Sequence, residues 1–156
     1  MGSHTSRWAA VNALYYEWTG DGQAREDGFR SLNYATYFAG EDGRISCCGL
    51  GFNGPYWFSD GYADYLRHFN WVMASIPDLA PVGQDHLLRS SSVVQQVSYA
   101  PREVRYRTFD RQGTEVLRLS FRPAAREGVV VEALAGGDFV VRVRREGTRE
   151  AVLRGE

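Results

Sequence analysis

The feature that most constrains the fold of this chain is a change in hydrophobic periodicity near Gln84. Before that residue, apolar side chains recur every three or four positions, which is helical spacing, and beyond it they alternate with polar ones, which is strand spacing. Helices in one half and strands in the other indicate an α+β protein. We therefore predict an N-terminal helical hairpin plus a third helix over residues 7–83, followed by a mostly antiparallel β-sandwich-like domain over residues 84–156.

The first two helices are predicted to form a hairpin. One stripe of the first helix contains Trp8, Val11, Tyr15 and Trp18. The sequence Thr-Gly-Asp-Gly at 19–22 stops this helix, and a second is expected over about 23–39, ending at Gly40. Its expected buried stripe is Phe29, Leu32, Thr36 and Ala39.

The third helix is expected to start at Ser59 or Asp60, either of which can cap it, and to end at Pro77 and Pro81. Its apolar stripe contains Tyr62, Tyr65, Leu66, Phe69, Val72, Met73 and Ile76. Together with one strand it should supply six buried side chains, namely Leu66, Phe69, Val72, Leu117, Leu119 and Phe121.

Six short strands are expected in the second half of the chain. Those at 93–99, 103–109 and 115–121 are separated by turn-forming residues, and their order predicts an antiparallel meander. Three more are expected near 129–131, 139–143 and 151–153. Six short strands favour a sandwich.

Composition excludes several classes of partner. The net charge is -1 and the 18 basic residues, all Arg, are scattered, so we expect no nucleic-acid partner. No stretch approaches the roughly 20 apolar residues that cross a bilayer, and no secretory signal is evident, so we expect a soluble chain without a membrane partner. Residues 1–6 have the look of a tag or linker remnant, and adjacent Cys47 and Cys48 are expected to be free thiols. The compartment stays open.

Several segments resemble one enzyme family. Residues 14–21 read LYYEWTGD and 29–35 read FRSLNYA, which resembles the helix, Thr-Gly-Asp turn, helix units of six-hairpin (α/α-toroid) glycoside hydrolases. Residues 57–69, WFSDGYADYLRHF, look like the last inner helix of bacterial members and the loop that feeds it. The segments similar to the β-domain that follows are LLRSSSVVQ at 87–95, YRTFD at 106–110 and EVLRL at 115–119.

The resemblance implies a C-terminal part of a carbohydrate-active hydrolase that contributes part of a glycan-contacting wall. Three helices cannot close a ring of about a dozen, and each missing hairpin leaves an apolar flank that promotes self-association. The acid and the base of such enzymes come from different hairpins, so we expect this chain alone to be inactive. The alternative is a non-catalytic glycan- or protein-binding interaction module.

Asp60 and Asp64 are the candidate catalytic residues. Four positions apart at the start of a helix, they share a face near the positive end of its dipole, which suits a base better than an acid. The alternatives are a helix cap for Asp60 and a solvated or Arg67-paired side chain for Asp64. His68 is either a hydrogen-bonded structural histidine or a catalytic one, and the role of His86 is undetermined.

A sugar-contact surface is predicted before the third helix. Sugars bind to aromatic ring faces edged by polar groups, and the predicted contacts are Asn53, Tyr56, Trp57 and Asp60. The alternative is that Trp57 and Phe58 form a hydrophobic plug that anchors the loop. The sequence contains no nucleophile elbow, no phosphate-binding loop and no spaced His/Cys metal set, so neither a cofactor nor a metal is expected.

Overall fold

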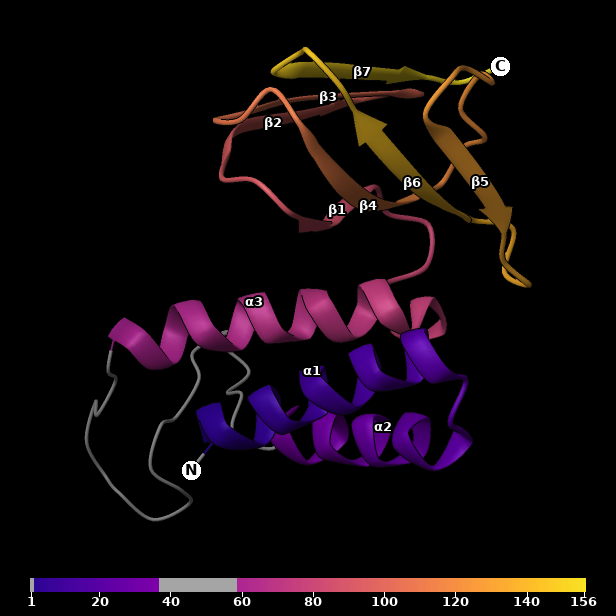
Figure 1. Ribbon diagram of the computed structural model, residues 1–156. Coiled ribbons are helices and arrows are strands. Elements are labelled where there is room, and N and C mark those ends of the chain that lie inside the picture. Colours follow the sequence, from indigo (N-terminus) through magenta and orange to yellow (C-terminus); the bar gives the residue numbers. More distant parts are fainter. Residues whose placement is uncertain (1, 37–58) are drawn as a thin grey trace. The chain divides into compact units, whose positions relative to one another are not determined.

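The computed structural model describes residues 2–36 and 59–156, with side chains at 4–35 and 67–156. Its described part contains three α-helices followed by seven strands in two antiparallel sheets, which confirms the predicted α+β class (Figure 1). The chain divides into two compact units, Met1–Leu79 and Ala80–Glu156, called here the helical unit and the β-unit. The sequence places its domain boundary after residue 83.

The first two helices are joined by a tightly capped turn. Helix α1 is Gly2–Thr19 and α2 is Gly22–Thr36. Gly20, at a φ of 72°, donates its N–H to the carbonyl of Tyr16 at 2.8 Å, which closes α1 in the left-handed conformation that glycine favours. Asp21 Oδ1 accepts the N–H of Gln23 at 2.9 Å and caps α2. The predicted helix-turn-helix is confirmed. Helix α1 also includes most of residues 1–6, and their assignment to a tag or linker remnant stays a prediction.

Small side chains hold α1 close to its neighbours. The core of the helical unit contains Ala9, Ala10, Ala13, Leu32, Val72 and Ile76. A Cβ added at Gly28 of α2 would lie 3.3 Å from both the backbone nitrogen of Ala13 and the carbonyl oxygen of Ala9. This glycine therefore allows the close approach of α1 and α2, and a larger side chain there would push them apart.

The buried stripes of the other two helices match the sequence in part. In α2, Leu32 is buried and Phe29 half-buried, while Thr36 and Ala39 lie outside the described side chains. Ala24, Gly28 and Ala35, which the prediction omitted, are buried as well. Helix α3, Ser59–Ser75, buries Val72, half-buries Phe69 and Met73, and is followed by buried Ile76 and a 3-10 turn at Pro77–Leu79. The side chains of Tyr62, Tyr65 and Leu66 are not described.

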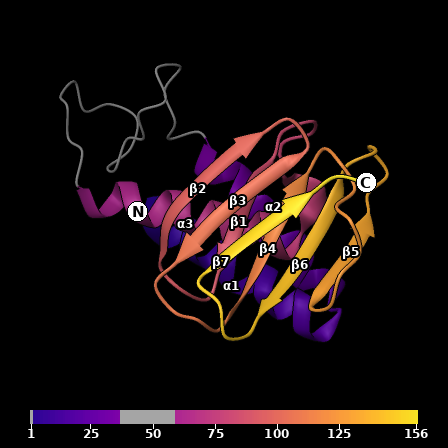
Figure 2. The ribbon, with the colours of Figure 1, turned by 90° about the horizontal axis from the view of Figure 1, so that it is seen from above.

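The β-unit is a sandwich of two antiparallel sheets. Its strands are β1 His86–Ser90, β2 Val94–Ala100, β3 Glu103–Thr108, β4 Gly113–Leu119, β5 Val129–Ala133, β6 Phe139–Arg145 and β7 Glu150–Arg154. One sheet has the order β1-β4-β6-β5 and the other the order β2-β3-β7. Figures 1 and 2 show the second sheet stacked on the first.

The predicted meander is wrong. Strands β3 and β4 follow each other in sequence but do not pair, because β3 pairs with β2 and β7 whereas β4 pairs with β1 and β6. Residues 109–112 carry the chain from one sheet to the other. This crossing lets the inward side chains of both strands, such as Tyr106 and Leu117, pack in one core, whereas a meander would place both strands in one sheet.

Strand β1 was not predicted. It lacks clean alternation, and its pairing with β4 is interrupted by a register shift between Leu87 and Arg89. Such a bulge moves successive side chains off the two-residue repeat on which strand prediction depends.

The core of the sandwich comes from inward positions of β3, β4, β6 and β7 and from the segment after β4. It contains Val104, Tyr106, Leu117, Leu119, Phe121, Val141, Val143, Ala151 and Leu153.

Of the six predicted core residues, Val72, Leu117, Leu119 and Phe121 are buried and Phe69 is half-buried, while the side chain of Leu66 lies outside the described part. Each large buried side chain contributes about 1.5–3 kcal/mol of hydrophobic stabilisation.

Candidate functional site

Most of the predicted site residues fall outside what the structure describes. Asn53, Tyr56 and Trp57 lie outside the described residues. The backbones of Asp60 and Asp64 lie in the first two turns of α3, four residues apart, but their side chains are not described. Their catalytic and glycan-binding roles therefore stay predictions.

His68 of α3 takes part in polar contacts between helices. It is buried, and its Nδ1 lies 3.4 Å from the hydroxyl of buried Ser6 on α1. A second contact joins the same two helices, where Ser75 donates its hydroxyl hydrogen to Glu17 at 2.7 Å. Of the two roles considered for His68, structural and catalytic, this arrangement fits the structural one. His86 lies on β1 with its Nε2 3.2 Å from Gln84 Oε1.

The aromatic stripe of α1 is exposed. Trp8 is 58% exposed, Val11 56%, Tyr15 51% and Trp18 74%. Successive helical residues are about 100° apart, which places this stripe on the side of α1 opposite its buried alanines. We call these four residues the α1 seam. Helix α1 is thus apolar on two opposite faces, of which the described residues cover only one.

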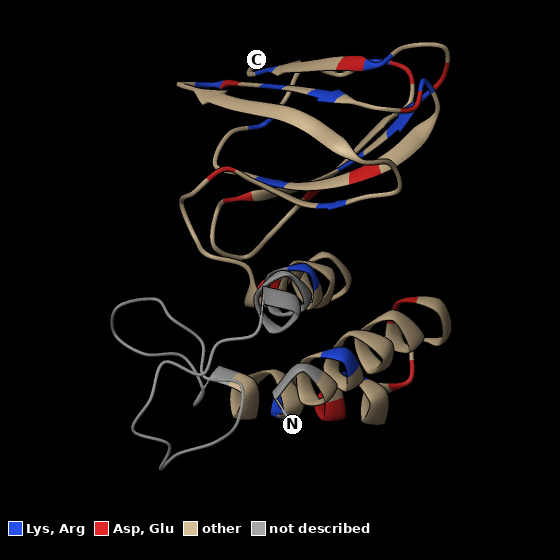
Figure 3. Cartoon of the chain, turned by 90° about the vertical axis from the view of Figure 1, so that its left-hand side faces the viewer, with Lys and Arg blue, Asp and Glu red and all other residues tan. Residues whose placement is uncertain are grey.

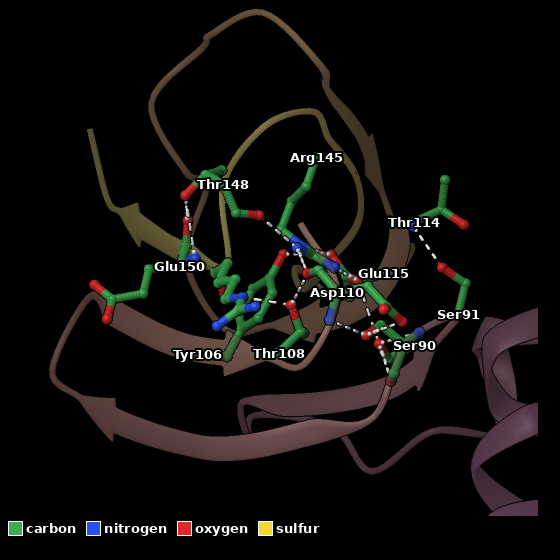
Figure 4. A network of polar contacts seen from close by, with 12 residues as sticks. Ser90, Ser91, Tyr106, Thr108, Asp110, Thr114, Glu115, Arg145, Thr148 and Glu150 are labelled. Carbon is green, nitrogen blue, oxygen red and sulfur yellow. Dashed lines mark hydrogen bonds and ion pairs between the residues drawn. The ribbon is translucent and has the colours of Figure 1, made fainter. Parts of the chain in front are cut away.

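The β-unit contains a buried ion pair between its sheets (Figure 4). Glu115 points inward from β4 and Arg145 from the end of β6, with side chains 0% and 2% exposed. The guanidinium binds the carboxylate through two parallel hydrogen bonds, Nε to Oε2 at 2.8 Å and Nη2 to Oε1 at 2.9 Å. This two-point geometry is the strongest form of such a pair.

Neighbouring groups complete the hydrogen bonding of both partners. Tyr106 donates its hydroxyl to Glu115 Oε2 at 2.9 Å, and Ser90 donates to Oε1 at 3.2 Å. Arg145 Nη1 donates to the carbonyl oxygens of Asp110 and Thr148 at 2.9 and 2.7 Å. With the carboxylate accepting four hydrogen bonds, this network is suited to holding strands together and leaves the carboxylate little capacity to bind a substrate.

The network also shifts the pKa values of its members. Burial raises the pKa of the Tyr106 hydroxyl above its ordinary value of 10.0, and the adjacent negative charge of Glu115 raises it further. The hydrogen bonds to Glu115 raise the pKa of Arg145. Tyr106 therefore stays a protonated donor and Arg145 a cation throughout the physiological range.

We expect the chain to lose stability at alkaline pH through Tyr106. In the unfolded chain this tyrosine ionises near pH 10.0, whereas in the fold it stays protonated, so its contribution is complete below that pH and declines above it. Tyr106→Phe should lower the free energy of unfolding by about 1 kcal/mol at neutral pH. It should also flatten the decline above pH 10, measured by urea unfolding across pH.

The same substitution at exposed Tyr15 is the control. It should leave both the neutral stability and the alkaline decline nearly unchanged. An alkaline decline that is equally steep in Tyr106→Phe and in the parent chain would show that another group is responsible.

A second buried pair anchors the start of the β-unit. Arg118 of β4 binds Asp138 through Nε and Oδ2 at 2.8 Å, and both side chains are buried. Arg118 Nη1 donates to the carbonyl of Ala80 at 2.7 Å, and the N–H of Gly83 donates to Asp138 Oδ2 at 2.8 Å. This pair therefore fastens residues 80–83 to the sandwich, which is also a structural role.

A hollow of about 530 Å³ opens at one end of the sandwich, between residues 126–128 and the adjoining ends of β6 and β7. Its lining combines Val143 and Ala151 with charged groups that include Arg126 and Glu127. Arg126 Nη1 already donates to the carbonyl of Val152 at 2.9 Å. The lining contains no aromatic ring, so it lacks the stacking surface typical of a sugar site.

Acidic and basic residues are both scattered over the β-unit in Figure 3, and β2 carries no charged residue. Among the described residues, no group of three or more His, Cys, Asp or Glu side chains could hold a metal ion. No helix in the described ranges has both the length and the apolar character that a membrane span requires.

The buried network was missed from the sequence, although a signal for it exists. Glu115 occupies the same alternation as Leu117 and Leu119, and Arg145 the same as Val141 and Val143, so strand periodicity places both charges on inward faces. An acid and a base predicted on inward faces of two strands indicate a buried pair.

Comparison of the chain with protein-family models, with curated proteins and with solved structures gave no match.

Proposed function

We propose that this chain is the C-terminal part of a carbohydrate-active hydrolase, that it contributes part of a glycan-contacting wall, and that it is not catalytic alone. The observation that carries the proposal is the exposed α1 seam. A helix that is apolar on two opposite faces is suited to a layer in which other helices cover both. Helices stacked in a ring provide that environment.

Two further features support the proposal. The turn at Thr19, Gly20 and Asp21 stops one helix and caps the next, as the hairpins of a helical ring require. Three helices are followed by an antiparallel sandwich, which is the order that the resemblance implies.

Two buried carboxylates support the proposed non-catalytic character. Glycoside hydrolysis needs two carboxyl groups about 5–10 Å apart with room for the substrate between them. The carboxylates of Glu115 and Asp138 are buried in ion pairs, which leaves no such room beside them. Asp60 and Asp64 would supply one half of a catalytic pair, and another part of the hydrolase the other half.

The alternative function is a non-catalytic interaction module that binds a glycan or a protein. The open hollow of the β-unit favours this reading, and its charged rim without aromatic rings favours a polar protein segment over a sugar. The two functions predict different coding sequences upstream of this chain. Further in-frame Thr-Gly-Asp hairpins would support the hydrolase part, whereas a natural start codon near Met1 would support the interaction module.

Oligosaccharide binding at Trp57 tests the proposed wall. We expect oligosaccharides to perturb the tryptophan fluorescence of the chain, and Trp57→Ala to weaken binding roughly three- to tenfold without unfolding, because a ring face is removed. The matched control is Trp71→Ala, at a partly exposed tryptophan of α3.

Two results would contradict this proposal. The first is an unchanged fluorescence across a broad glycan panel at millimolar concentrations, which would contradict the proposed glycan-contacting wall. The second is hydrolysis of glycosides by the chain alone that disappears in the Asp60→Asn variant, which would contradict the proposal that the chain is not catalytic alone.

A further inference from the structure

The α1 seam has a spacing that reads the same in both directions. Its residues stand at 8, 11, 15 and 18, with steps of three, four and three, symmetric about the level of Ala13. Steps of three and four are also the a and d positions of a heptad, which form the contact line between two packed helices. In antiparallel helix pairs, an a residue of one helix lies opposite a d residue of the other.

We propose that the α1 seam docks onto the α1 seam of a second copy of this chain, antiparallel, with the two-fold axis at the level of Ala13. Trp8 then faces Trp18 of the second copy, and Val11 faces its Tyr15. The contact is isologous, because each copy offers the same patch. The inference rests on the proposed function only in taking the seam as a surface that another helix covers, and it concerns the chain by itself, in which a second copy takes the place of the neighbouring helix of the ring.

The chemistry of the seam suits this partner. Its four side chains carry no charge, so pairing with an identical surface brings no like charges together along the contact line. At the exposed fractions given above, three aromatic rings and a valine leave on the order of 500 Å² uncovered per copy. Two copies would bury about 1,000 Å², which is at the lower limit for a specific interface and predicts a reversible, concentration-dependent dimer.

Sedimentation of the whole chain over a range of concentrations tests the pairing. We expect a monomer–dimer equilibrium that Trp8→Ala and Trp18→Ala each weaken roughly thirtyfold, because aromatic anchors dominate such contacts. Phe109→Ala is the matched control, since Phe109 is 59% exposed on the β-unit, and it should leave the equilibrium unchanged. Circular dichroism should show that all three variants stay folded.

Disulfide trapping tests the direction of the helices, in a Cys47→Ser, Cys48→Ser background. In the antiparallel pair, Val11 lies level with Tyr15 of the second copy on the contact line, whereas residue 4 lies about 27 Å along the axis from its own counterpart. Val11→Cys mixed with Tyr15→Cys should therefore form the mixed disulfide, and His4→Cys alone should not cross-link, because a disulfide needs Cα atoms within about 7 Å. In a parallel pair, residue 4 would lie on the contact line opposite its own counterpart, and His4→Cys would cross-link.

The outcomes separate this inference from the proposed function. A chain that stays monomeric at its highest soluble concentration, or one that cross-links through His4→Cys, overturns the antiparallel dimer. A monomer that still binds oligosaccharides through Trp57 overturns only the dimer. An antiparallel dimer without glycan binding supports the inference and overturns the glycan-contacting wall.

Discussion

Replacing Arg145 by methionine is expected to lower the free energy of unfolding by about 3–5 kcal/mol. The change leaves the carboxylate of Glu115 fully buried without its cation, while Tyr106 and Ser90 supply only two neutral hydrogen bonds. The loss should appear as a lower midpoint in urea unfolding with an unchanged slope. Glu115→Gln should cost a similar amount, because it leaves the guanidinium uncompensated.

Two controls separate the buried charge from the lost packing. The double variant Glu115→Leu, Arg145→Met removes both charges, and it should recover most of the stability, since apolar pairs replace buried ion pairs at little cost. Arg142→Met breaks an exposed pair with Glu132 on the same sheet and should cost less than about 1 kcal/mol. Equal losses for Arg142→Met and Arg145→Met would show that burial does not set the energy of these pairs.

Gly128→Ala is expected to lower the free energy of unfolding by roughly 2–4 kcal/mol. Gly128 has a φ of 74°, a conformation that side chains disfavour, and an added Cβ would lie 2.6 Å from the carbonyl oxygen of Arg144. Because that atom belongs to the backbone of β6, relief requires the turn to move away from the strand. Thermal or urea unfolding measures the loss.

Gly137→Ala is the matched control for Gly128→Ala. Gly137 has a φ of 86°, but nothing lies within 4 Å of its added Cβ, so the substitution should cost only the backbone strain of about 1–2 kcal/mol. The difference between the two variants isolates the collision. If both lose the same stability, the collision at Arg144 is relieved at no cost.

The local elements were predictable because their signals are local. The stop at Gly20 and the cap at Asp21 depend on residues within one turn, and strands such as β3 and β7 follow two-residue alternation of buried and exposed side chains. Sheet order is different, because the choice of β7 over β4 as the neighbour of β3 depends on a segment distant in sequence. No local pattern carries that choice.

The sequence located the aromatic stripe of α1 but could not show which face of the helix is covered. Ala9 and Ala13 contribute little to the hydrophobic periodicity from which a buried face is predicted, yet their small size is what allows α2 to approach. Packing therefore selects the alanine face and leaves the larger rings of Trp8 and Trp18 outside. For the candidate site, the sequence supplied Asn53, Tyr56 and Trp57, which lie outside the described residues.

The pairing of β3 with β7 has a consequence for the kinetics of folding. The helices of the hairpin make contacts between near neighbours in sequence, so they can form early, whereas Glu103 meets Arg154 only after a long loop closes. Until the last strand arrives, β3 has one open hydrogen-bonding edge, which is a template for pairing with another chain. Closure of β7 is therefore the step at which correct folding of the β-unit competes with aggregation.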